Sequence, residues 1–372
     1  MQQLKLLFSL MGMCLLLGLS SCSDEVKSVF GDDFDIPELT DANTIQFTVD
    51  ATGEWKILEI LASGGRMAIE WGDGRLQKIE KPDYTPIQYK YRTSKTFMVR
   101  VWAEELEFFS VSGILIPVSN MRVGKFPKMK NIDLNSVKAT KELDLNASCP
   151  NLEYMNIGNW EDLRELHIDK CKNLEMIDIY THPKLASIKF GHSERLKTLH
   201  CTDTGITSLS LRGLPALNAV TLTGTAQLSA LEVDANNGIT TLQIEGCAFT
   251  YLDFLDKLTS LTALDCSSNK LTKLDMSPNT KLWHLNCYAN QLESLLIPKD
   301  NQLITVDCRD NKLDKDELNS VFNALVDISG YPSYYGKCVI AYGGNPGEAD
   351  CDETIWQKKH WVDEVNTKNR IK

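Results

Sequence analysis

The sequence has few cysteines, no cluster of basic residues and no long apolar run after residue 21. Each of these features excludes a class of protein. Eleven cysteines among 372 residues are far too few for a disulfide scaffold. The formal net charge is −11 without any cluster of five basic residues, so we expect no binding to nucleic acid through its phosphates. After residue 21, no apolar run is long enough to span a bilayer.

The common catalytic and metal-binding motifs are also missing. The chain contains no G-x-S-x-G, no H-E-x-x-H, no phosphate-binding P-loop and no C-x-x-C pair. Its six histidines are scattered, and no two of them have metal-ligand spacing on one helix. We therefore expect a protein that is not an enzyme and that uses neither a cofactor nor a metal.

Residues 1–21 have the pattern of a secretory signal: Lys5 precedes a mostly apolar stretch, and small residues follow. The ending Leu19-Ser20-Ser21-Cys22 resembles a bacterial lipobox, which implies cleavage before Cys22 and diacylation of its thiol. The alternative is an ordinary signal peptide and a chance cysteine. Several lipid chains on Cys22 would hold the protein on a membrane without a spanning helix.

Residues 22–42 are acidic and contain few strand-forming residues, so we expect a lipidated, flexible tether. Ser23-Asp24-Glu25 resembles the surface-export signal of Bacteroidetes lipoproteins, whereas the alternative is a solvated linker that happens to be acidic. The resemblance implies a protein that is lipid-anchored in the outer membrane and exposed at the cell surface.

Residues 43–113 are predicted to form a small β-sandwich, because short strand-like runs alternate with Gly, Asp and Pro clusters. The segment 71–74, Trp-Gly-Asp-Gly, predicts a tight turn; Asp73 as a metal ligand is the alternative, although one carboxylate makes no cation cage. The segment IEWGDG, Tyr91 and FMVRV resemble PKD-type immunoglobulin-like modules, except that Lys95-Thr96-Phe97 stands where Gly-x-Tyr is usual. The strand-like runs are 45–49, 55–61, 67–71, 97–102 and 106–111.

Residues 114–313 repeat one pattern every 21 to 23 residues. The clearest copies, L-x-x-L/V-x-C-x-x-N-x-L, begin at Leu261, Leu282 and Leu303, and this spacing matches the leucine-rich repeat. One such turn cannot bury its leucines, but a stack of turns can. We therefore expect a mainly β solenoid of about nine turns. The earlier turns begin at Met129, Leu152, Leu174, Leu196, Leu217 and Ile239.

Two stacked rows are predicted inside this solenoid. The first is a ladder of buried thiols at Cys266, Cys287 and Cys308, because side chains stacked in parallel about 4.8 Å apart do not present the geometry of a disulfide. This ladder, with its 21-residue period, resembles internalin-J-type repeats. The second row is a ladder of inward asparagines that bond backbone groups in the bend after each strand. It consists of Asn269, Asn290 and Asn311, whereas Asn279 lies outside the position and is expected to matter less.

The outward side chains of the strands form two rows that such repeats use for ligands. The acidic residues in the first row favour a neutral or basic partner. Tyr288 and Arg309 are the preferred anchors, because both residue types are common at binding hot spots. For each residue the alternative is a solvated sheet surface. The candidates are Asp178, Tyr180, His200, Asp265, His284, Asn286, Tyr288, Asp307 and Arg309.

Residues 314–372 are predicted to cap the solenoid. Asp314-Lys-Asp-Glu317 is a variant capping box, and the apolar residues that follow have helical spacing. Segments 344–347, 351–352 and 359–361 resemble the terminal module of Bacteroidetes leucine-rich repeat lipoproteins. Cys338 and Cys351 form either a disulfide or two separate buried thiols.

These observations predict a mainly β protein: a PKD-like sandwich, a leucine-rich repeat solenoid and an α-helical cap. The predicted function is non-catalytic binding or adhesion to a protein at the cell surface through the face of the repeats. The alternative is a glycan-binding component of surface nutrient capture. The expected membrane contact is the lipid anchor at Cys22.

Overall fold

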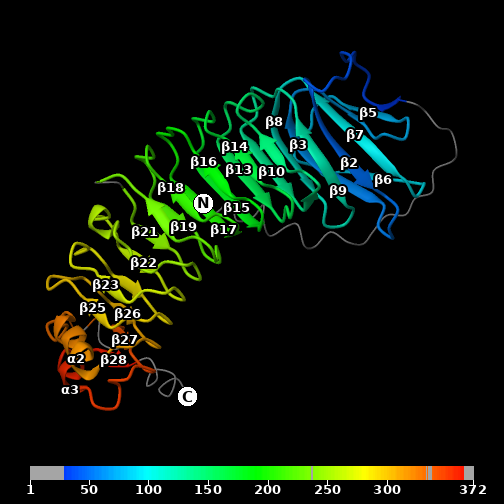
Figure 1. The fold of residues 1–372 in the computed structure, drawn as a ribbon. Helices are drawn as coiled ribbons and strands as arrows, with labels where there is room; N and C mark the ends of the chain where they lie inside the picture. The colour runs from blue at the N-terminus through cyan, green and yellow to red at the C-terminus, as the bar shows by residue number, and fades with distance from the viewer. Residues whose placement is uncertain (1–28, 236–237, 332, 334–336, 364–372) are drawn as a thin grey trace.

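The computed structural model describes residues 29–235, 238–331, 333 and 337–363. The chain forms two large sheets and three small ones. Figure 1 shows a β-rich N-terminal region that continues into a curved solenoid, with the helices α2 and α3 at its far end. No helix within the described ranges is both long and apolar enough to cross a membrane.

The first large sheet belongs to the N-terminal region and is mostly antiparallel. Its inward side chains Phe47, Val49 and Val99 are fully buried, as the alternation of strand residues requires. The strand-like runs 45–49, 67–71 and 97–102 of the sequence correspond to three strands of this sheet, and four further strands complete it. In spatial order the sheet contains β1 (Val29–Gly31), β5 (Leu76–Ile79), β4 (Met67–Glu70), β7 (Thr96–Ala103), β2 (Thr44–Asp50), β9 (Val118–Val123) and β11 (Val137–Lys138).

The predicted tether is wrong for the described part of residues 22–42. β1 pairs with β5, and Phe34 is only 8% exposed because it packs with Ala68 and Trp102. The cationic groups of Arg66 and Lys78 also lie 5.5 Å from the centre of the Phe34 ring. Despite its acidic composition, this segment carries enough apolar surface to pack. Residues 22–28, with Cys22, lie outside the described residues.

The second large sheet passes from the N-terminal region into the solenoid without a break. β3 (Ile57–Gly64) pairs with β6 (Ile87–Lys90) and β8 (Leu106–Ser112), and β8 then pairs in parallel with β10 (Asn131–Asn135). β9 follows β8 in the chain yet returns to pair with β2. The sequence-based boundary between residues 113 and 114 therefore does not coincide with a structural boundary.

All nine predicted turns contribute a parallel strand to this long sheet, and two more strands from residues 314–372 extend it. The central side chain of each three-residue strand up to β26 is buried between two more exposed neighbours. After β10, the strands are β13 (Tyr154–Gly158), β15 (Met176–His182), β17 (Thr198–Thr204), β19 (Ala219–Thr221), β21 (Thr241–Gln243), β22 (Ala263–Asp265), β24 (His284–Asn286), β26 (Thr305–Asp307), β27 (Val339–Ala341) and β28 (Val362–Asp363).

Short strands and one 3-10 helix, η2 (Leu255–Lys257), form the other side of the turns. In Figure 1 the long sheet lies on the inner side of the curve and the short strands lie on the outer side. We call these the concave and the convex face. The convex strands are β12 (Glu142–Asp144), β14 (Glu165–His167), β16 (Ser187–Lys189), β18 (Ser208–Ser210), β20 (Ala230–Glu232), β23 (Lys273–Asp275) and β25 (Ser294–Leu296).

Helix α2 (Lys315–Ala324) follows the last of the nine turns. The Asp314 carboxylate accepts hydrogen bonds from the backbone N–H groups of Asp316 and Glu317, as an N-cap does. The second half of a capping box is not formed, because Glu317 Oε1 instead accepts the Leu295 N–H of β25 at 2.8 Å. The predicted helix therefore exists, and Glu317 ties it to the neighbouring turn.

The remaining described residues form α3 (Thr354–Lys358), which packs beside α2, and the last two strands of the long sheet. Cys338 is buried and Cys351 is partly exposed, and both are free thiols in the structure. The C-terminal module therefore combines helices with a continuation of the solenoid sheet.

Candidate binding face and the ladder beneath it

Beneath the concave face, one buried side chain in most turns forms a hydrogen bond to the preceding turn. In the clearest case, Asn290 Nδ2 donates to the carbonyl of Cys266 at 3.0 Å and to that of Cys287 at 3.1 Å. Asn290 Oδ1 accepts the Leu271 N–H at 3.0 Å. One amide thus satisfies backbone groups that the bend leaves without regular partners. We call this the ladder position; it lies three residues after the second inward residue of each turn.

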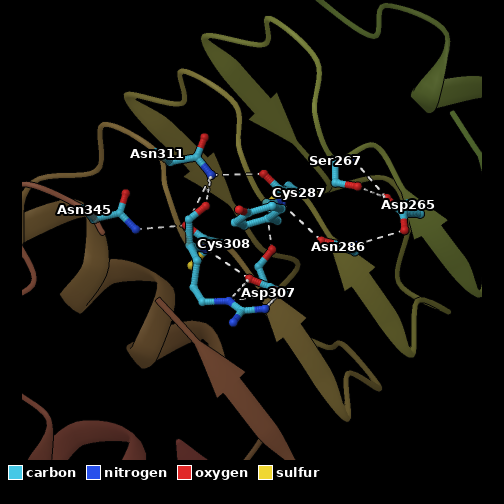
Figure 2. A network of polar contacts seen from close by, with 10 residues as sticks. Asp265, Ser267, Asn286, Cys287, Asp307, Cys308, Asn311 and Asn345 are labelled. Carbon is cyan, nitrogen blue, oxygen red and sulfur yellow. Dashed lines mark hydrogen bonds and ion pairs between the residues drawn. The ribbon is translucent and has the colours of Figure 1, made fainter. Parts of the chain in front are cut away.

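The ladder continues past the three predicted asparagines. Asn345 Nδ2 donates to the Cys308 carbonyl at 2.9 Å (Figure 2). Its Oδ1 accepts the Leu313 N–H at 3.0 Å. The sequence analysis missed this residue, because Tyr342 replaces cysteine in that turn and a helix interrupts the 21-residue period. The sequence feature that could have identified Asn345 is its position three residues after Tyr342, the same spacing as between cysteine and asparagine in the earlier turns.

In the N-terminal turns, other residue types occupy the same position and make the same bond. Trp160 Nε1 donates to the Leu134 carbonyl at 3.2 Å, and His182 Nε2 lies 3.1 Å from the Ile157 carbonyl. Since a carbonyl only accepts, the His182 proton lies on Nε2. Two later turns follow the rule, with Thr225 Oγ1 donating to Cys201 at 3.3 Å and Cys247 Sγ to Leu222 at 3.3 Å. Two turns depart from this pattern, since Val137 has no side-chain donor and Thr204 instead shares a hydrogen bond with the Thr225 hydroxyl at 3.3 Å. The ladder position therefore usually holds a donor and does not have to be asparagine.

The cysteines of the predicted thiol ladder lie in consecutive turns and are fully buried. Cys266, Cys287 and Cys308 are free thiols that pack in the core. Burial raises the pKa of each of them, so they stay protonated and unreactive at neutral pH. They act as small apolar residues of the core.

Three candidate ligands in the C-terminal turns have structural roles. Asp265, Asn286 and Asp307 lie in one row across β22, β24 and β26. The side-chain oxygen of each accepts the backbone N–H of the residue two positions later, at 3.0 to 3.1 Å. Asn286 Nδ2 also donates to Asp265 Oδ2 at 2.9 Å (Figure 2). These side chains close the bend after each strand, which leaves them little capacity for a ligand.

The preferred anchors Tyr288 and Arg309 lie together. The guanidinium carbon of Arg309 is 5.5 Å from the centre of the Tyr288 ring, and Arg309 Nε donates to Asp307 at 2.9 Å. On the same turns, His284 Nδ1 lies 2.7 Å from the Thr305 hydroxyl. A hollow of about 490 Å³ opens on the sheet between β21 and β27, lined in part by His284 and Asp307. This end of the face is therefore polar, shallow and internally paired.

The N-terminal turns present carboxylates without such partners. Asp133, Asn156, Asp178 and His200 lie in register across β10, β13, β15 and β17. Burial raises the pKa of Asp133 to about 6. The negative charge of Asp178 also raises this pKa, whereas a hydrogen bond from Ser110 lowers it. Burial also raises the pKa of Asp178, although His200 opposes the shift. The sequence analysis placed Asp133 and Asn156 in this row and did not single them out.

Tyr180 lies flat on the sheet. A side chain at Gly158 would collide with the Tyr180 ring, and the Tyr180 hydroxyl accepts a hydrogen bond from Asn135 Nδ2 two strands away. Because Gly158 has no Cβ, the Tyr180 ring can pack directly against the backbone at this position. Gly158 and Asn135 are site residues that only the register of the strands reveals.

The metal-binding alternative for Asp73 finds no support in the geometry. Asp73 lies in the turn between β4 and β5, where it accepts the Arg75 N–H at 3.2 Å and the hydroxyl of Tyr89. Within the part of the chain that the structure describes, no three His, Cys, Asp or Glu residues are grouped to hold a metal ion.

The parallel sheet, the stacked turns and the buried ladder define a mainly β solenoid of the leucine-rich repeat type, with few helices. Among solved structures, the chain is similar to the functional domain of InlJ from Listeria monocytogenes, which includes a cysteine ladder. Sequence identity is 19%, the TM-score is 0.51, and the match covers 68% of this chain and 57% of that chain. The likeness therefore shows the fold, over little more than half the length of that protein.

The chain is also similar to the internalin InlF from Listeria monocytogenes, with 14% identity, a TM-score of 0.38 and coverage of 69% of this chain and 86% of that chain. No protein-family model matches the sequence. A search of curated proteins finds no match either.

Proposed function

We propose that this protein is a non-catalytic, lipid-anchored surface protein that binds another protein through its concave face. The observation that carries the proposal is the long parallel sheet, which presents one in-register row of partly exposed, mostly polar side chains from β10 to β26. The cross-bonded ladder beneath this row holds the strands in place, so the surface is preorganised for binding.

The location rests on the N-terminal sequence. Cleavage before Cys22 and lipidation of its thiol would place the protein in the outer membrane, and the acidic residues after Cys22 would direct it to the cell surface. Six residues separate Cys22 from Val29, the first residue of β1. Fully extended, they reach at most about 25 Å, so the N-terminal sheets would lie close to the membrane. We assign these sheets to a PKD-like module and residues 314–372 to a capping role.

Replacement of the lipidation site tests this location. We expect Cys22→Ala to abolish membrane association, because no later segment replaces the lipid anchor. Cell fractionation with detergent extraction measures it. Normal processing of the variant and unchanged recovery with the outer membrane would contradict the lipoprotein assignment.

A pair of face variants tests the binding function. Thr221→Arg places a bulky charge on the concave strand β19, and Ala230→Arg places the same charge on the exposed convex strand β20 of that turn. Affinity capture with the full chain should recover a protein that Thr221→Arg loses and Ala230→Arg retains. Equal capture by both variants, or no capture above background, would count against the proposal.

Glycan binding is the second candidate, and the hollow on the C-terminal turns favours it. Its lining contains the exposed side chains of His284 and Gln243, and Tyr288 lies nearby with 37% of its surface exposed. Aromatic rings beside hydrogen-bonding groups suit a sugar. Binding to a glycan array that is lost in Tyr288→Ala would support this function over protein binding.

A further inference from the structure

The N-terminal turns of the concave face carry a row of acceptors for which the protein itself supplies few donors. Ser110, Asp133, Asn156 and Asp178 lie in register on β8, β10, β13 and β15. We call these four residues the acceptor row. Apart from Ser110, which serves Asp133, they offer carboxylate and amide oxygens to whatever covers the sheet.

Two independent observations show that the carboxylates lack cationic partners and that an amide oxygen beside them lacks a donor. Among the described residues, neither Asp133 nor Asp178 forms an ion pair, in contrast to Asp307, which Arg309 neutralises. The buried Oδ1 atoms of Asn156 and its neighbour Asn131 also accept no hydrogen bond within this part of the chain. Buried acceptors without donors are unfavourable, so a ligand that brings donors gains affinity here.

Large apolar and aromatic side chains lie on both sides of the acceptor row. On one side Phe108, Tyr154 and Met176 lie in one row, with Asn131 between Phe108 and Tyr154. On the other side the Tyr180 ring covers Gly158. Carboxylates between aromatic rings suit a planar cation, because a guanidinium can bond the oxygens and stack on the rings at once.

We infer that the acceptor row binds arginine side chains of an extended segment of the protein partner. This inference rests on the proposed protein-binding function and names the chemistry of the partner. The charge of the site agrees with it, since two carboxylates face the partner and only His200 lies near as an opposing group. It also moves the expected anchor from Tyr288 and Arg309 to Asp133 and Asp178.

The spacing of the carboxylates suggests the shape of the segment. Asp133 and Asp178 lie two strands apart, a separation of about 9.6 Å between backbones. In a polyproline II helix, residues three apart lie on the same side and about 9.3 Å apart. An Arg-x-x-Arg segment in this conformation, running along the solenoid axis, would place one arginine over each carboxylate.

Peptide binding to the full chain tests the inference. The probe is a fluorescein-labelled Arg-Pro-Pro-Arg peptide, compared with Lys-Pro-Pro-Lys and Glu-Pro-Pro-Glu by fluorescence anisotropy at low salt. We expect the arginine peptide to bind more tightly than the lysine peptide, no binding of the glutamate peptide, and weaker binding as salt rises. Equal affinity for the arginine and glutamate peptides would overturn the inference.

The decisive comparison uses two double variants that remove the same charge. Asp133→Asn with Asp178→Asn should weaken binding of the arginine peptide at least about tenfold, because charge-assisted bonds are lost. Asp144→Asn with Asp275→Asn alters the convex face and keeps the side-chain oxygens that accept the N–H groups of Asn146 and Ser277. This control should bind as the wild type does. Equal affinity of the two double variants would reject the site.

The outcome is separable from that of the proposed function. Asparagine is close in size to aspartate and neutral, so we expect both variants to fold, which thermal unfolding checks; Asp178→Asn alone provides a second, milder test. A protein that Thr221→Arg loses but that binds the Asp133→Asn, Asp178→Asn chain normally would reject the arginine site and leave the function intact. If the arginine peptide binds but no protein is captured, the arginine site is supported and the proposed protein-binding function is rejected.

Discussion

The two halves of the solenoid solve one structural problem with different residues. From Asn269 to Asn345, every ladder position is asparagine, and each amide donates to the preceding turn and accepts a backbone N–H through its oxygen. From Trp160 to Cys247, the position holds tryptophan, histidine, threonine or cysteine. Trp160, His182, Thr225 and Cys247 each donate one bond to the preceding turn, whereas Thr204 bonds the Thr225 hydroxyl of the next turn.

The two halves share one kind of bond and differ in another. A donor toward the preceding carbonyl is common to both halves, and the accepted N–H is a feature of the asparagine turns. A residue that makes both bonds fixes the length of the bend, which explains the strict 21-residue period where cysteine and asparagine recur. The N-terminal turns have one bond fewer, and their spacing varies between 21 and 23 residues.

The largest expected effect is the loss of an asparagine. Asn290→Ala should lower the free energy of unfolding by about 3 kcal/mol, because it leaves the buried Leu271 N–H unpaired, at about 1–3 kcal/mol, and removes the Nδ2 bond to the Cys266 carbonyl, which keeps its bond from Asn269 Nδ2. Denaturant unfolding measures it. Gln291→Ala, an exposed neighbour, is the control and should change stability by less than about 0.5 kcal/mol; similar losses in both variants would contradict the ladder.

The expectation that Asn279 matters less is not supported by the geometry. Asn279 is fully buried, and its Nδ2 donates to the carbonyls of Leu255 and Leu258 at 3.1 and 2.8 Å. It serves the convex side of the turn, where the strand pattern gives no guidance. Asn279 is therefore unsuitable as a control.

A substitution in a turn whose ladder residue makes a donor bond only should lower the free energy of unfolding less than Asn290→Ala does. Thr225→Val keeps the shape of the side chain and removes the one donor to the Cys201 carbonyl. We expect destabilisation of about 1–2 kcal/mol, roughly half the effect of Asn290→Ala. Thermal or denaturant unfolding gives the value. A loss as large as that of Asn290→Ala would show that the two halves do not differ in the way described.

The histidine turn should make the N-terminal half sensitive to pH. Burial lowers the pKa of His182 below its ordinary value of 6.5, so below about pH 6.5 the unfolded chain binds a proton that the folded chain does not. Stability contributed by neutral His182 is therefore present above pH 6.5 and is lost as the pH falls. The stability difference between the wild type and His182→Gln should shrink as the pH is lowered, and a constant difference would exclude this role.

The smallest effect concerns the residue that turns each bend. Ala289 has a φ of 53°, whereas Gly224 and Gly246 occupy the corresponding bends of earlier turns with φ of 68° and 66°. A left-handed conformation costs an alanine roughly 1 kcal/mol. Ala289→Gly should therefore stabilise the protein by about 0.5 kcal/mol, as a small rise in the denaturant midpoint. A loss of stability would mean that the bend is not strained.

Much of the solenoid follows from the sequence because its repeats are local. The spacing of the leucines predicts the concave strand of each of the nine turns, from β10 to β26, and the outward rows in their true register. The fusion of the N-terminal sheet with the solenoid could not be predicted, since the pairing of β8 with β10 and of β9 with β2 depends on long-range contacts. The packing of Phe34 on Trp102 was missed for the same reason.

The site was predicted as a surface and not as a set of interactions. Side-chain alternation identifies which residues face outward, but it does not show that Asp265, Asn286 and Asp307 bond their own backbone. It also cannot show that Asp133 and Asp178 are left unpaired. These differences arise from neighbours across the sheet, such as Gly158 under Tyr180, which no single turn reveals.

The central claim is that ladder side chains bond the backbone across neighbouring turns. Native-state hydrogen exchange of two backbone amides tests it most directly, because Leu271 N–H donates to Asn290 Oδ1 and Leu292 N–H donates to Asn311 Oδ1. In Asn290→Ala, we predict that the Leu271 amide loses its protection while the Leu292 amide keeps it. Equal protection of the Leu271 amide in the wild type and the variant would contradict the claim.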